Sequence, residues 1–374
     1  MKIAITGADG FIAKNLRIRL QELGHLEIAQ ITRSTSQEEL KQHLAGADCV
    51  FHLAGVNRPQ DPAEFATGNA GLTESICDIL AAAKRETRLV LTSSTQAALD
   101  NPYGRSKAAA EAAAQKYGKA NNAPVHIFRL PNVFGKWARP NYNSAVATFC
   151  HNLVHGLPIS VNEAAPPLHL VYVDDVVQAF IDCLNAPASK QAAADVFDAV
   201  SPTYTTTIAE VAHTLRSFVG SRETLLSARV GCGLTRALYS TYISYLPPQA
   251  FAYTVPRHAD TRGEFVEMLK TEDSGQFSYF TAHPGVTRGE HYHHSKTEKF
   301  LVLKGTAHFG FRHILSGETH ELITRGGEAK IVETVPGWTH NITNIGDDEM
   351  IVMLWANEVF DRDRPDTISM KVKA

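Results

Sequence analysis

The sequence predicts an α/β domain followed by an all-β domain, on three observations. Residues 1–60 alternate short apolar strands with helical segments, an order that implies a parallel sheet with helices on both faces. Beyond residue 270, short strands recur at regular spacing between glycine and proline turns, which is typical of a compact β-barrel. Between the two patterns, an aromatic segment over 240–256 carries prolines that interrupt helix and sheet alike. We therefore predict two domains, over residues 1–245 and 246–374.

Length and composition exclude several classes of protein. The 374 residues suffice for two full-sized cores, and a net charge of −3 does not provide the clustered basic face that nucleic-acid binding requires. No apolar run approaches the ~20 residues that cross a bilayer, and the sequence begins directly with a strand, so we expect neither a membrane span nor a signal peptide. The five cysteines are scattered and form no C-x-x-C pair, which is typical of reduced residues in a cytoplasmic protein.

The periodicity of the apolar residues places the elements of both domains. In the first domain, strands are predicted at residues 2–6, 26–32 and 49–53, and helices at 11–23 and 37–44. In the second domain, strands are predicted at residues 276–282, 299–303, 306–312, 330–335 and 350–355.

The first turn of the chain has the composition of a phosphate-binding turn. It reads Gly7, Ala, Asp, Gly10, Phe11, Ile12, Ala13. Glycines here let the backbone approach a pyrophosphate at the N-terminus of the following helix. The second strand ends with Arg33 and hydroxyl residues instead of the acidic residue that holds the ribose of NAD. These groups suit a 2′-phosphate, so we predict NADPH as the cofactor; an ordinary surface role for Arg33 is the alternative.

A serine and a Tyr-x-x-x-Lys pair supply candidate catalytic groups. Tyr103 and Lys107 are four residues apart at the head of an alanine-rich helix, so they share one face. A nearby ammonium is expected to lower the pKa of Tyr103 and make it a proton donor to a carbonyl near neutral pH. Ser94, at a strand end, would hydrogen-bond the same carbonyl oxygen, although the short gap to Tyr103 leaves Thr92 and Ser93 as alternatives.

These residues resemble the extended short-chain dehydrogenase/reductases, the branch that acts on nucleotide sugars. The resemblance implies a Rossmann-like fold with Ser94, Tyr103 and Lys107 as catalytic residues. It extends to the run His-Leu-Ala-Gly over 52–55, to Asn69, which steadies the cofactor loop in that family, and to the segment 129–135. The cofactor contacts that it implies are Gly7, Gly10, Phe11, Ile12, Arg33, Leu53, Ala54, Gly55, Asn69, Lys107 and Leu130. The expected substrate contacts in this domain are Asn132 and Asn143.

In the second domain, four residues form a candidate metal-ligand set. His291 and His293 are two residues apart, so in a strand they point to one face, and Glu298 can approach from the next strand. His340 follows a turn glycine, Gly337. Three imidazoles and a carboxylate suit zinc, iron, nickel or manganese.

The spacing of this set resembles the two motifs of the cupins, except that the proline of the second motif stands one residue late, at Pro336. The resemblance implies a cupin barrel with one divalent metal per chain, most simply zinc. The run 260–265 resembles the opening of deoxysugar 3,5-epimerases, which makes Arg262 an expected substrate contact or else a strand cap. The run 288–291 resembles the segment that carries their catalytic histidine, so His291 is predicted as a metal ligand or as a metal-free base.

Over nearly its whole length the chain resembles a bacterial family of bifunctional UDP-sugar epimerase/reductases of capsular polysaccharide and O-antigen synthesis. The matching segments include those beginning at His52, Asp100, Phe134 and Pro140. The resemblance implies a UDP-linked 6-deoxy-4-keto-N-acetylhexosamine as substrate. The cupin would epimerise carbon 3 of a UDP-2-acetamido-2,6-dideoxy-4-hexulose. The reductase would then reduce carbon 4 to UDP-2-acetamido-2,6-dideoxy-L-talose, a precursor of UDP-N-acetyl-L-fucosamine.

Two alternatives to the bifunctional enzyme stay open. The cupin could be only a metal-stabilised dimerisation module beside a working reductase, because metal binding can contribute folding energy alone. The fold could also serve an NADPH-sensing binding protein. The tyrosine-rich segment between the domains suggests a homodimer in either case.

Overall fold

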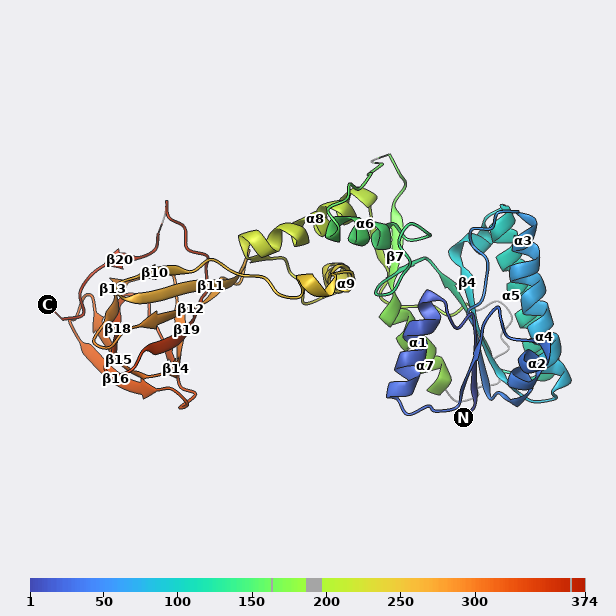
Figure 1. Ribbon diagram of the computed structural model, residues 1–374, viewed down its shortest axis with the longest axis horizontal. Helices are drawn as coiled ribbons and strands as arrows, with labels where there is room; N and C mark the ends of the chain where they lie inside the picture. Colours follow the sequence, from blue (N-terminus) through green and yellow to red (C-terminus); the bar gives the residue numbers. More distant parts are fainter. Residues whose placement is uncertain (163, 186–196, 364, 374) are drawn as a thin grey trace. The chain divides into compact units, whose positions relative to one another are not determined.

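The computed structural model describes residues 1–162, 164–185, 197–363 and 365–373, which form two compact units (Figure 1). The first unit comprises Met1–Leu215 and Ala237–Leu246, and the second comprises Arg216–Arg236 and Pro247–Ala374. The main division thus falls one residue from the predicted boundary. Residues 216–236, predicted in the first domain, group with the second unit, where β9 (Leu226–Ser227) pairs in parallel with β11 (Gly263–Thr271).

The first unit is built on a sheet of five parallel strands in the order β2-β1-β3-β4-β5. Their bounds are β1 (Ile3–Thr6), β2 (Ile28–Ile31), β3 (Cys49–His52), β4 (Arg88–Ser94) and β5 (Val125–Leu130). The predicted α/β class is confirmed. The strand order reverses between β1 and β3, so a crevice opens at the carboxyl ends of these two strands, where open α/β sheets bind their ligands.

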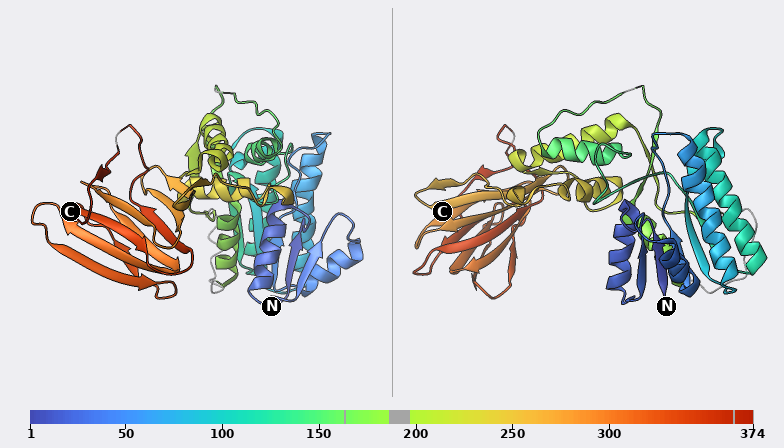
Figure 2. Two further views of the ribbon diagram at one scale, coloured as in Figure 1. Left: turned by 60° about the vertical axis from the view of Figure 1, so that its left-hand side comes forward. Right: turned by 45° about the vertical axis from the view of Figure 1, so that its right-hand side comes forward.

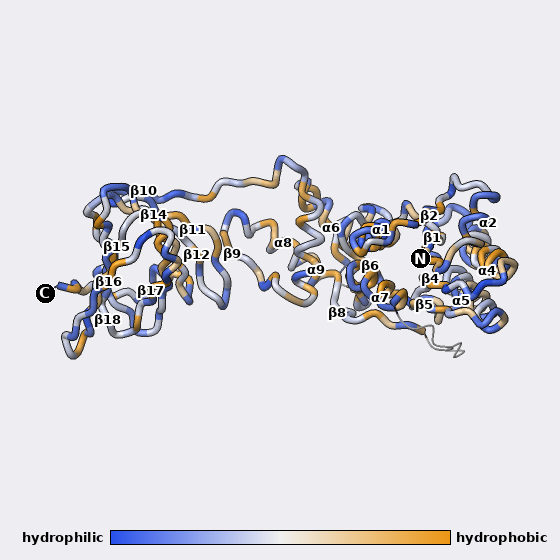
Figure 3. Tube along the Cα trace, turned by 90° about the horizontal axis from the view of Figure 1, so that it is seen from below, coloured by the Kyte–Doolittle hydropathy of each residue, from blue (hydrophilic) through white to orange (hydrophobic). Residues whose placement is uncertain are grey.

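Helices cover both faces of this sheet (Figures 1 and 2). One face carries α1 (Phe11–Glu22) and α7 (Val173–Asn185). The other carries α2 (Gln37–Gly46), α4 (Leu72–Ala82) and α5 (Pro102–Asn121). α4 continues from the short helix α3 (Ala63–Phe65) through the π-helical turn η1 (Ala66–Gly71), and η2 (Thr95–Ala98) follows β4. α4 is strongly hydrophobic (Figure 3), and its residues Ile76, Cys77 and Leu80 are buried in the core beside the sheet.

A smaller layer completes the first unit. β6 (Asn132–Phe134), β7 (Leu168–Tyr172) and β8 (Tyr204–Thr206) form a three-stranded sheet. The remaining helices are α6 (Ala145–Val154), α8 (Ile208–Thr224) and α9 (Gly233–Ile243); the 3₁₀ turn η3 (Pro248–Ala250) belongs to the second unit. α8 begins in the first unit and ends in the second. None of the described helices is long and apolar enough to cross a membrane.

The second unit consists mainly of two sheets, which confirms the all-β prediction for the C-terminal part. The larger has the order β10-β11-β12-β19-β14-β17, and the smaller has the order β16-β15-β18-β13-β20. Besides β11, the bounds in the larger sheet are β10 (His258–Asp260), β12 (Gln276–Ala282), β14 (Glu298–Lys304), β17 (Ile331–Glu333) and β19 (Met350–Ala356). In the smaller sheet they are β13 (Thr287–Tyr292), β15 (Thr306–His313), β16 (Thr319–Arg325), β18 (Trp338–Asn344) and β20 (Ile368–Ser369). Phe280, Phe300 and Phe309 are buried in the core of this unit.

The prediction of individual strands in this unit was incomplete. β12, β14, β15 and β19 match predicted strands, and the predicted strand at 330–335 shortens to the three residues of β17. β10, β11, β13, β16, β18 and β20 have no counterpart among the predicted strands. β16 and β18 are rich in threonine and other polar residues, so their apolar alternation is weak; β16 pairs with β15, and β18 pairs with both β15 and β13.

Candidate active site and candidate metal centre

The glycine turn after β1 brings two backbone segments close together. Gly7 has a φ of +66°, and a Cβ atom at this position would lie 2.8 Å from the Cα atom of Ala54. The N–H of Gly10 donates to the carbonyl oxygen of Gly7 at 2.8 Å, and α1 begins at the next residue. The turn therefore presents the free N–H groups of a helix N-terminus beside the loop that follows β3, an arrangement that binds phosphate.

The loop after β3 is held by Asn69 and Thr6. The side-chain oxygen of Asn69 accepts from the N–H of Val56 at 2.8 Å, and its side-chain nitrogen donates to the carbonyl oxygen of Val56 at 2.9 Å. Asn69 lies in the π-helical turn η1, a local distortion that often marks functional sites. The N–H of Ala54 donates to the hydroxyl of Thr6 at 3.2 Å. Asn69 therefore makes direct hydrogen bonds to the loop that the family resemblance expects it to steady.

Ser94, Tyr103 and Lys107 come together at the carboxyl end of β4. Asn101 caps α5 by accepting from the N–H of Gly104 at 2.7 Å, so the helix begins immediately before Tyr103. The Lys107 ammonium donates to the carbonyl oxygen of Thr92 at 2.6 Å, and Ser94 and Tyr103 are hydrogen-bonded through their side chains.

The hydroxyls of Thr92 and Ser93, the two alternatives to Ser94, form hydrogen bonds with other groups. The Thr92 hydroxyl donates to the carbonyl oxygen of His52 at 3.3 Å. The Ser93 hydroxyl donates to the carboxylate of Glu111, a buried residue that also accepts two hydrogen bonds from Arg129, at 2.9 and 2.7 Å. Glu111 was missed from the sequence, where its only signal is an acidic residue one turn after Lys107 in an alanine-rich helix. These contacts leave Ser94 as the hydroxyl that faces Tyr103.

The expected lowering of the Tyr103 pKa is wrong. Burial raises the pKa of Tyr103, and the hydrogen bond with Ser94 offsets this only in part. Burial also lowers the pKa of Lys107 to about 8, with Glu111 acting in the opposite direction. Tyr103 is therefore a neutral phenol at neutral pH, and the Lys107 ammonium is directed to a backbone carbonyl.

A cleft of about 580 Å³ joins the glycine turn to this catalytic group. Every predicted cofactor contact except Arg33 lines it, as do the predicted substrate contacts Asn132 and Asn143 and the catalytic residue candidates Ser94 and Tyr103. Arg33 is exposed in the turn after β2 and is not part of this lining. Arg139 and Tyr142 also line the cleft and were not singled out from the sequence; Tyr142 donates to the side-chain oxygen of Asn57 at 2.6 Å.

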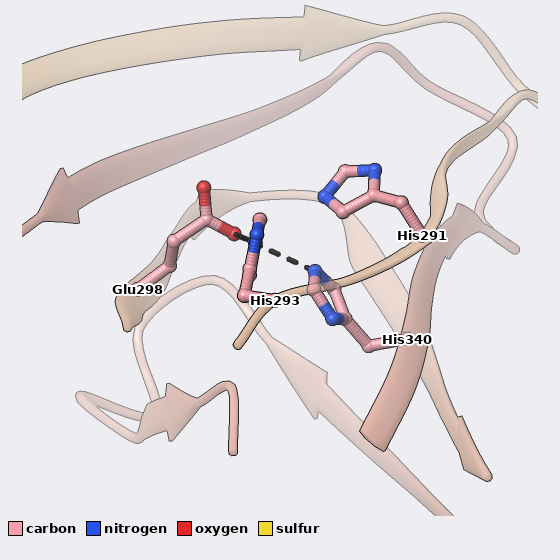
Figure 4. Close-up of side chains that lie close together, drawn as sticks. All are labelled: His291, His293, Glu298 and His340. Atoms are coloured by element: carbon pink, nitrogen blue, oxygen red, sulfur yellow. Dashed lines mark hydrogen bonds and ion pairs between the residues drawn. The ribbon is translucent and has the colours of Figure 1, made fainter. Parts of the chain in front are cut away.

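In the second unit the four predicted metal ligands converge from both sheets (Figure 4). His291 and His340 are register partners in β13 and β18, Glu298 opens β14, and His293 lies directly after β13 instead of within it. One ligand atom from each residue lies within 4.8 Å of the others. Nε2 of His293 and Nε2 of His340 lie 3.3 and 3.5 Å from Oε2 of Glu298.

The environment of these side chains fits a bound cation. Both ring nitrogens of His340 are buried; Nδ1 has no hydrogen-bond partner among the described residues, and Nε2 lies at the limit of hydrogen bonding, 3.5 Å from Oε2 of Glu298. A buried imidazole that is so weakly satisfied is costly, and a cation would satisfy it. Burial, followed by the charges of the neighbouring groups, lowers the pKa of His291 to about 4, so this ring is neutral and able to donate a lone pair at neutral pH.

Glu298 is buried yet ionised. Burial tends to raise its pKa, but the hydrogen bonds with His293 and His340 and the charge of Lys296 outweigh burial and hold the pKa well below its usual range. Nζ of Lys296, itself buried, lies 3.3 Å from Oε1 of Glu298. The carboxylate thus faces the ammonium with one oxygen and the imidazoles with the other.

The predicted substrate contact Arg262 lies in the second unit directly before β11 and pairs with Asp260 at 2.5 Å. Its Nε also lies 3.0 Å from the same carboxylate. The side chain is more than half exposed, so the pairing leaves part of the guanidinium open to a ligand.

Comparison with known proteins covers both units. The family described as the NAD dependent epimerase/dehydratase family matches residues 3–199, and the one described as the polysaccharide biosynthesis C-terminal domain matches residues 258–368. A protein of Pseudomonas aeruginosa named UDP-2-acetamido-2,6-beta-L-arabino-hexul-4-ose reductase is 55% identical over 372 residues, which cover 100% of this chain and 99% of that protein.

Solved structures agree with these matches. The crystal structure of the capsular polysaccharide assembling protein CapF of Staphylococcus aureus is 39% identical, with a TM-score of 0.90, over 99% of this chain and 100% of that chain. The UDP-glucuronic acid 4-epimerase of Bacillus cereus in complex with NAD is 17% identical, with a TM-score of 0.53, over 66% of this chain and 96% of that chain, which supports the fold alone. The whole-chain resemblance expected from the sequence is confirmed.

Proposed function

Because the chain belongs to the NAD dependent epimerase/dehydratase family, we propose that it is a reductase of a UDP-linked 4-keto sugar that uses NADPH. The observation that carries the proposal is the single cleft that holds both the phosphate-binding turn at Gly7 and the group Ser94, Tyr103 and Lys107. The relative from Pseudomonas aeruginosa, 55% identical and named as a 4-ulose reductase, supports the same substrate class. The specific substrate proposed is UDP-2-acetamido-2,6-dideoxy-4-hexulose.

The residues of the cleft can supply the proton for this reduction. NADPH, when bound, supplies the hydride that adds to carbon 4 of the sugar. Tyr103 is a neutral phenol because burial raises its pKa, so its O–H can donate a hydrogen bond to the carbonyl oxygen and then transfer the proton to it. Ser94, whose side chain faces Tyr103, would turn its hydroxyl to donate a second hydrogen bond to that oxygen when the sugar is bound. Lys107 would hold the cofactor while anchored to Thr92.

The proposed preference for NADPH over NADH rests on the residues that follow β2. Arg33 and neighbouring hydroxyl groups occupy the place where NAD-specific enzymes have an acidic residue. Thr32 and Ser34 are hydrogen-bonded through their hydroxyls at 2.8 Å, which places polar groups beside the exposed guanidinium. A 2′-phosphate would be held there by charge-assisted hydrogen bonds.

For the second unit we propose epimerisation at carbon 3 of the same sugar. His291, His293, Glu298 and His340 would hold one divalent cation, most simply zinc. A bound cation supplies Lewis acidity, which makes a proton next to a ketone easier to remove. Arg262, partly exposed beside Asp260, would contact the substrate. The ketone at carbon 4 is what acidifies the proton at carbon 3, so epimerisation must precede reduction, and the product would be UDP-2-acetamido-2,6-dideoxy-L-talose.

The deciding experiment is proton NMR of the 4-keto UDP-sugar in heavy water with enzyme and without NADPH. We expect deuterium to appear at carbon 3 with the wild type. It should also appear with the control His294→Ala, because the imidazole that this variant removes is exposed. Exchange should stop with His293→Ala. Absence of exchange in the wild type, with reduction intact once NADPH is added, would contradict the epimerase.

A second candidate is a reductase whose second unit is a metal-stabilised dimerisation module. One observation favours it: four protein side chains surround the candidate metal position, and structural zinc sites are closed by four protein ligands, whereas catalytic zinc sites usually keep one position open. In that case His293→Ala would leave reduction intact but dissociate a homodimer in analytical ultracentrifugation. In the epimerase case the same variant would keep its oligomeric state and lose only the exchange.

A further inference from the structure

The C-terminal segment lies against the candidate metal centre. β20 pairs with β13, with Ser369 opposite His291 and Ile368 opposite Tyr292. Further along, the N–H of Val372 donates to the carboxylate of Glu290 at 2.7 Å. This segment therefore adds an edge to the sheet that carries two of the predicted metal ligands.

Asp366, two residues before β20, organises the loop that leads from His293 to Glu298. Its Oδ1 accepts from the backbone N–H of His294 at 2.8 Å. Its Oδ2 accepts from the backbone N–H groups of Ser295 and Lys296 at 2.7 and 2.8 Å, and from the hydroxyl of Ser295 at 3.0 Å. One carboxylate thus satisfies three successive N–H groups, which fixes the conformation of this loop.

The backbone carbonyl of the same residue contacts a predicted metal ligand. The carbonyl oxygen of Asp366 is hydrogen-bonded to Nδ1 of His293. A carbonyl oxygen can only accept, so Nδ1 must carry a proton, and with a cation bound the lone pair of His293 would then be on Nε2. Nε2 is the atom that lies 3.3 Å from Glu298 Oε2, on the side of the four-residue cluster.

The loop also orients a second predicted ligand. Lys296, whose N–H is held by Asp366, places its Nζ 3.3 Å from Oε1 of Glu298. This contact occupies one carboxylate oxygen and leaves Oε2 facing the imidazoles of His293 and His340. Asp366 therefore acts on His293 through its carbonyl and on Glu298 through Lys296.

We propose that Asp366 is a positioning residue for the metal centre: it sets the tautomer of His293 and restricts Glu298 to a single coordinating oxygen. The inference rests on the proposed metal site, whose four ligands it leaves unchanged. Partners that orient ligands in this way typically contribute 10- to 100-fold to metal affinity.

The test compares three variants of the full-length chain. Asp366→Ala removes all four side-chain contacts, Asp366→Asn keeps an oxygen acceptor but loses the charge, and Asp363→Ala is the control on an exposed carboxylate of the same segment. Zinc affinity is measured by competition with a chromophoric chelator. We expect Asp366→Ala to bind zinc about 10- to 100-fold more weakly than the wild type, Asp366→Asn to lie between them, and Asp363→Ala to match the wild type.

A metal-free readout separates positioning from a purely structural role. In the metal-free wild type, proton–nitrogen NMR of the imidazoles should show a slowly exchanging Nδ1–H on His293. Asp366→Ala keeps the backbone carbonyl but loses the side-chain contacts that hold it against the ring, so this proton should exchange faster in the variant. Lower thermal stability with unchanged zinc affinity and an unchanged Nδ1–H signal would overturn the proposal. A wild type that shows the Nδ1–H signal but binds no divalent metal would overturn the metal site itself. If Asp366→Ala does not fold, Asp366→Asn decides by the same two measurements.

Discussion

Nε2 of His293 lies 3.3 Å from Oε2 of Glu298, although His293 follows β13 in one sheet and Glu298 opens β14 in the other. The other oxygen of the carboxylate, Oε1, lies 3.3 Å from Nζ of Lys296. All three side chains are buried. A carboxylate in this position can balance the charge of a cation, which an amide of the same shape cannot.

The first prediction concerns metal content. We expect one divalent ion per chain by elemental analysis of the purified protein, and at least about 100-fold weaker zinc affinity for Glu298→Gln, because losing a ligand costs more than losing a partner that orients one. His294→Ala is the matched control, since it removes an exposed imidazole from the same loop. Equal loss of metal in both variants would show that the ligand set is wrong.

The second prediction separates reduction from epimerisation. Tyr103→Phe should lower kcat for reduction by about 10²- to 10⁴-fold, because the variant cannot donate the proton, while deuterium exchange at carbon 3 continues. Tyr117→Phe is the control on the same helix; its hydroxyl donates to the carbonyl of Thr87 at 2.9 Å, outside the cleft lining. Unchanged reduction by Tyr103→Phe, measured as NADPH oxidation, would show that Tyr103 is not the proton donor; no NADPH oxidation by the wild type would support a binding protein.

The third prediction distinguishes the neighbouring serines. Ser94→Ala should lower kcat by about 10²-fold, as expected when a donor to a developing oxyanion is removed. Ser93→Ala should leave kcat unchanged and lower the free energy of unfolding by about 1–3 kcal/mol, because the buried Glu111 carboxylate loses a donor. The two measurements are steady-state kinetics and urea denaturation. The reverse pattern would identify Ser93 as the catalytic hydroxyl.

The fourth prediction concerns cofactor choice. Arg33→Ala should raise KM for NADPH by about 10- to 100-fold and leave KM for NADH unchanged, since a hydrogen bond to a charged group contributes about 1.5–3 kcal/mol. Arg105→Ala is a matched control: this exposed arginine pairs with Asp100 and does not line the cleft. Equal increases for both cofactors would mean that Arg33 does not recognise the 2′-phosphate.

The fifth prediction concerns stability in acid. Burial, with a smaller effect of Lys107, lowers the pKa of His52 to about 3 from 6.5. Between these values the unfolded chain binds a proton that the folded chain does not. The contribution of His52 to stability is therefore full above pH 6.5 and falls by about 1.4 kcal/mol per pH unit as pH drops towards 3.

The variant His52→Gln tests whether the contribution of His52 to stability falls as the pH is lowered. Glutamine does not titrate and can still reach the hydroxyls of Thr6 and Thr73, which bond the imidazole at 2.7 and 3.0 Å. We expect the variant to be less stable than the wild type at pH 7 and this difference to shrink as pH falls to 4, measured by urea denaturation of the helical signal. The control His43→Gln, at an exposed histidine, should have the same free energy of unfolding as the wild type at every pH between 7 and 4. A difference that is independent of pH would contradict the argument.

Much of the fold was predictable because its signals are local. The alternation of strand and helix over residues 1–60 follows from apolar periodicity, and the strands β12, β14 and β19 follow from apolar runs between turns. β16 and β18 have no such run. β16 pairs with β15, and β18 pairs with β15 and β13, contacts that the polar sequence of either strand does not encode.

The sequence by itself determined which residues are candidates for chemistry. Tyr103 and Lys107 share a helix face, and His291 and His293 share a short span beside Glu298, so local geometry alone brings the members of each set together. Only the tertiary structure decided how they are used. It directed the hydroxyls of Thr92 and Ser93 to other partners and raised the pKa of Tyr103 instead of lowering it. It also placed Asp366 against His293 across 73 residues. The reason is physical: burial and hydrogen bonds between distant segments depend on how the chain packs, and no short stretch of sequence contains that information.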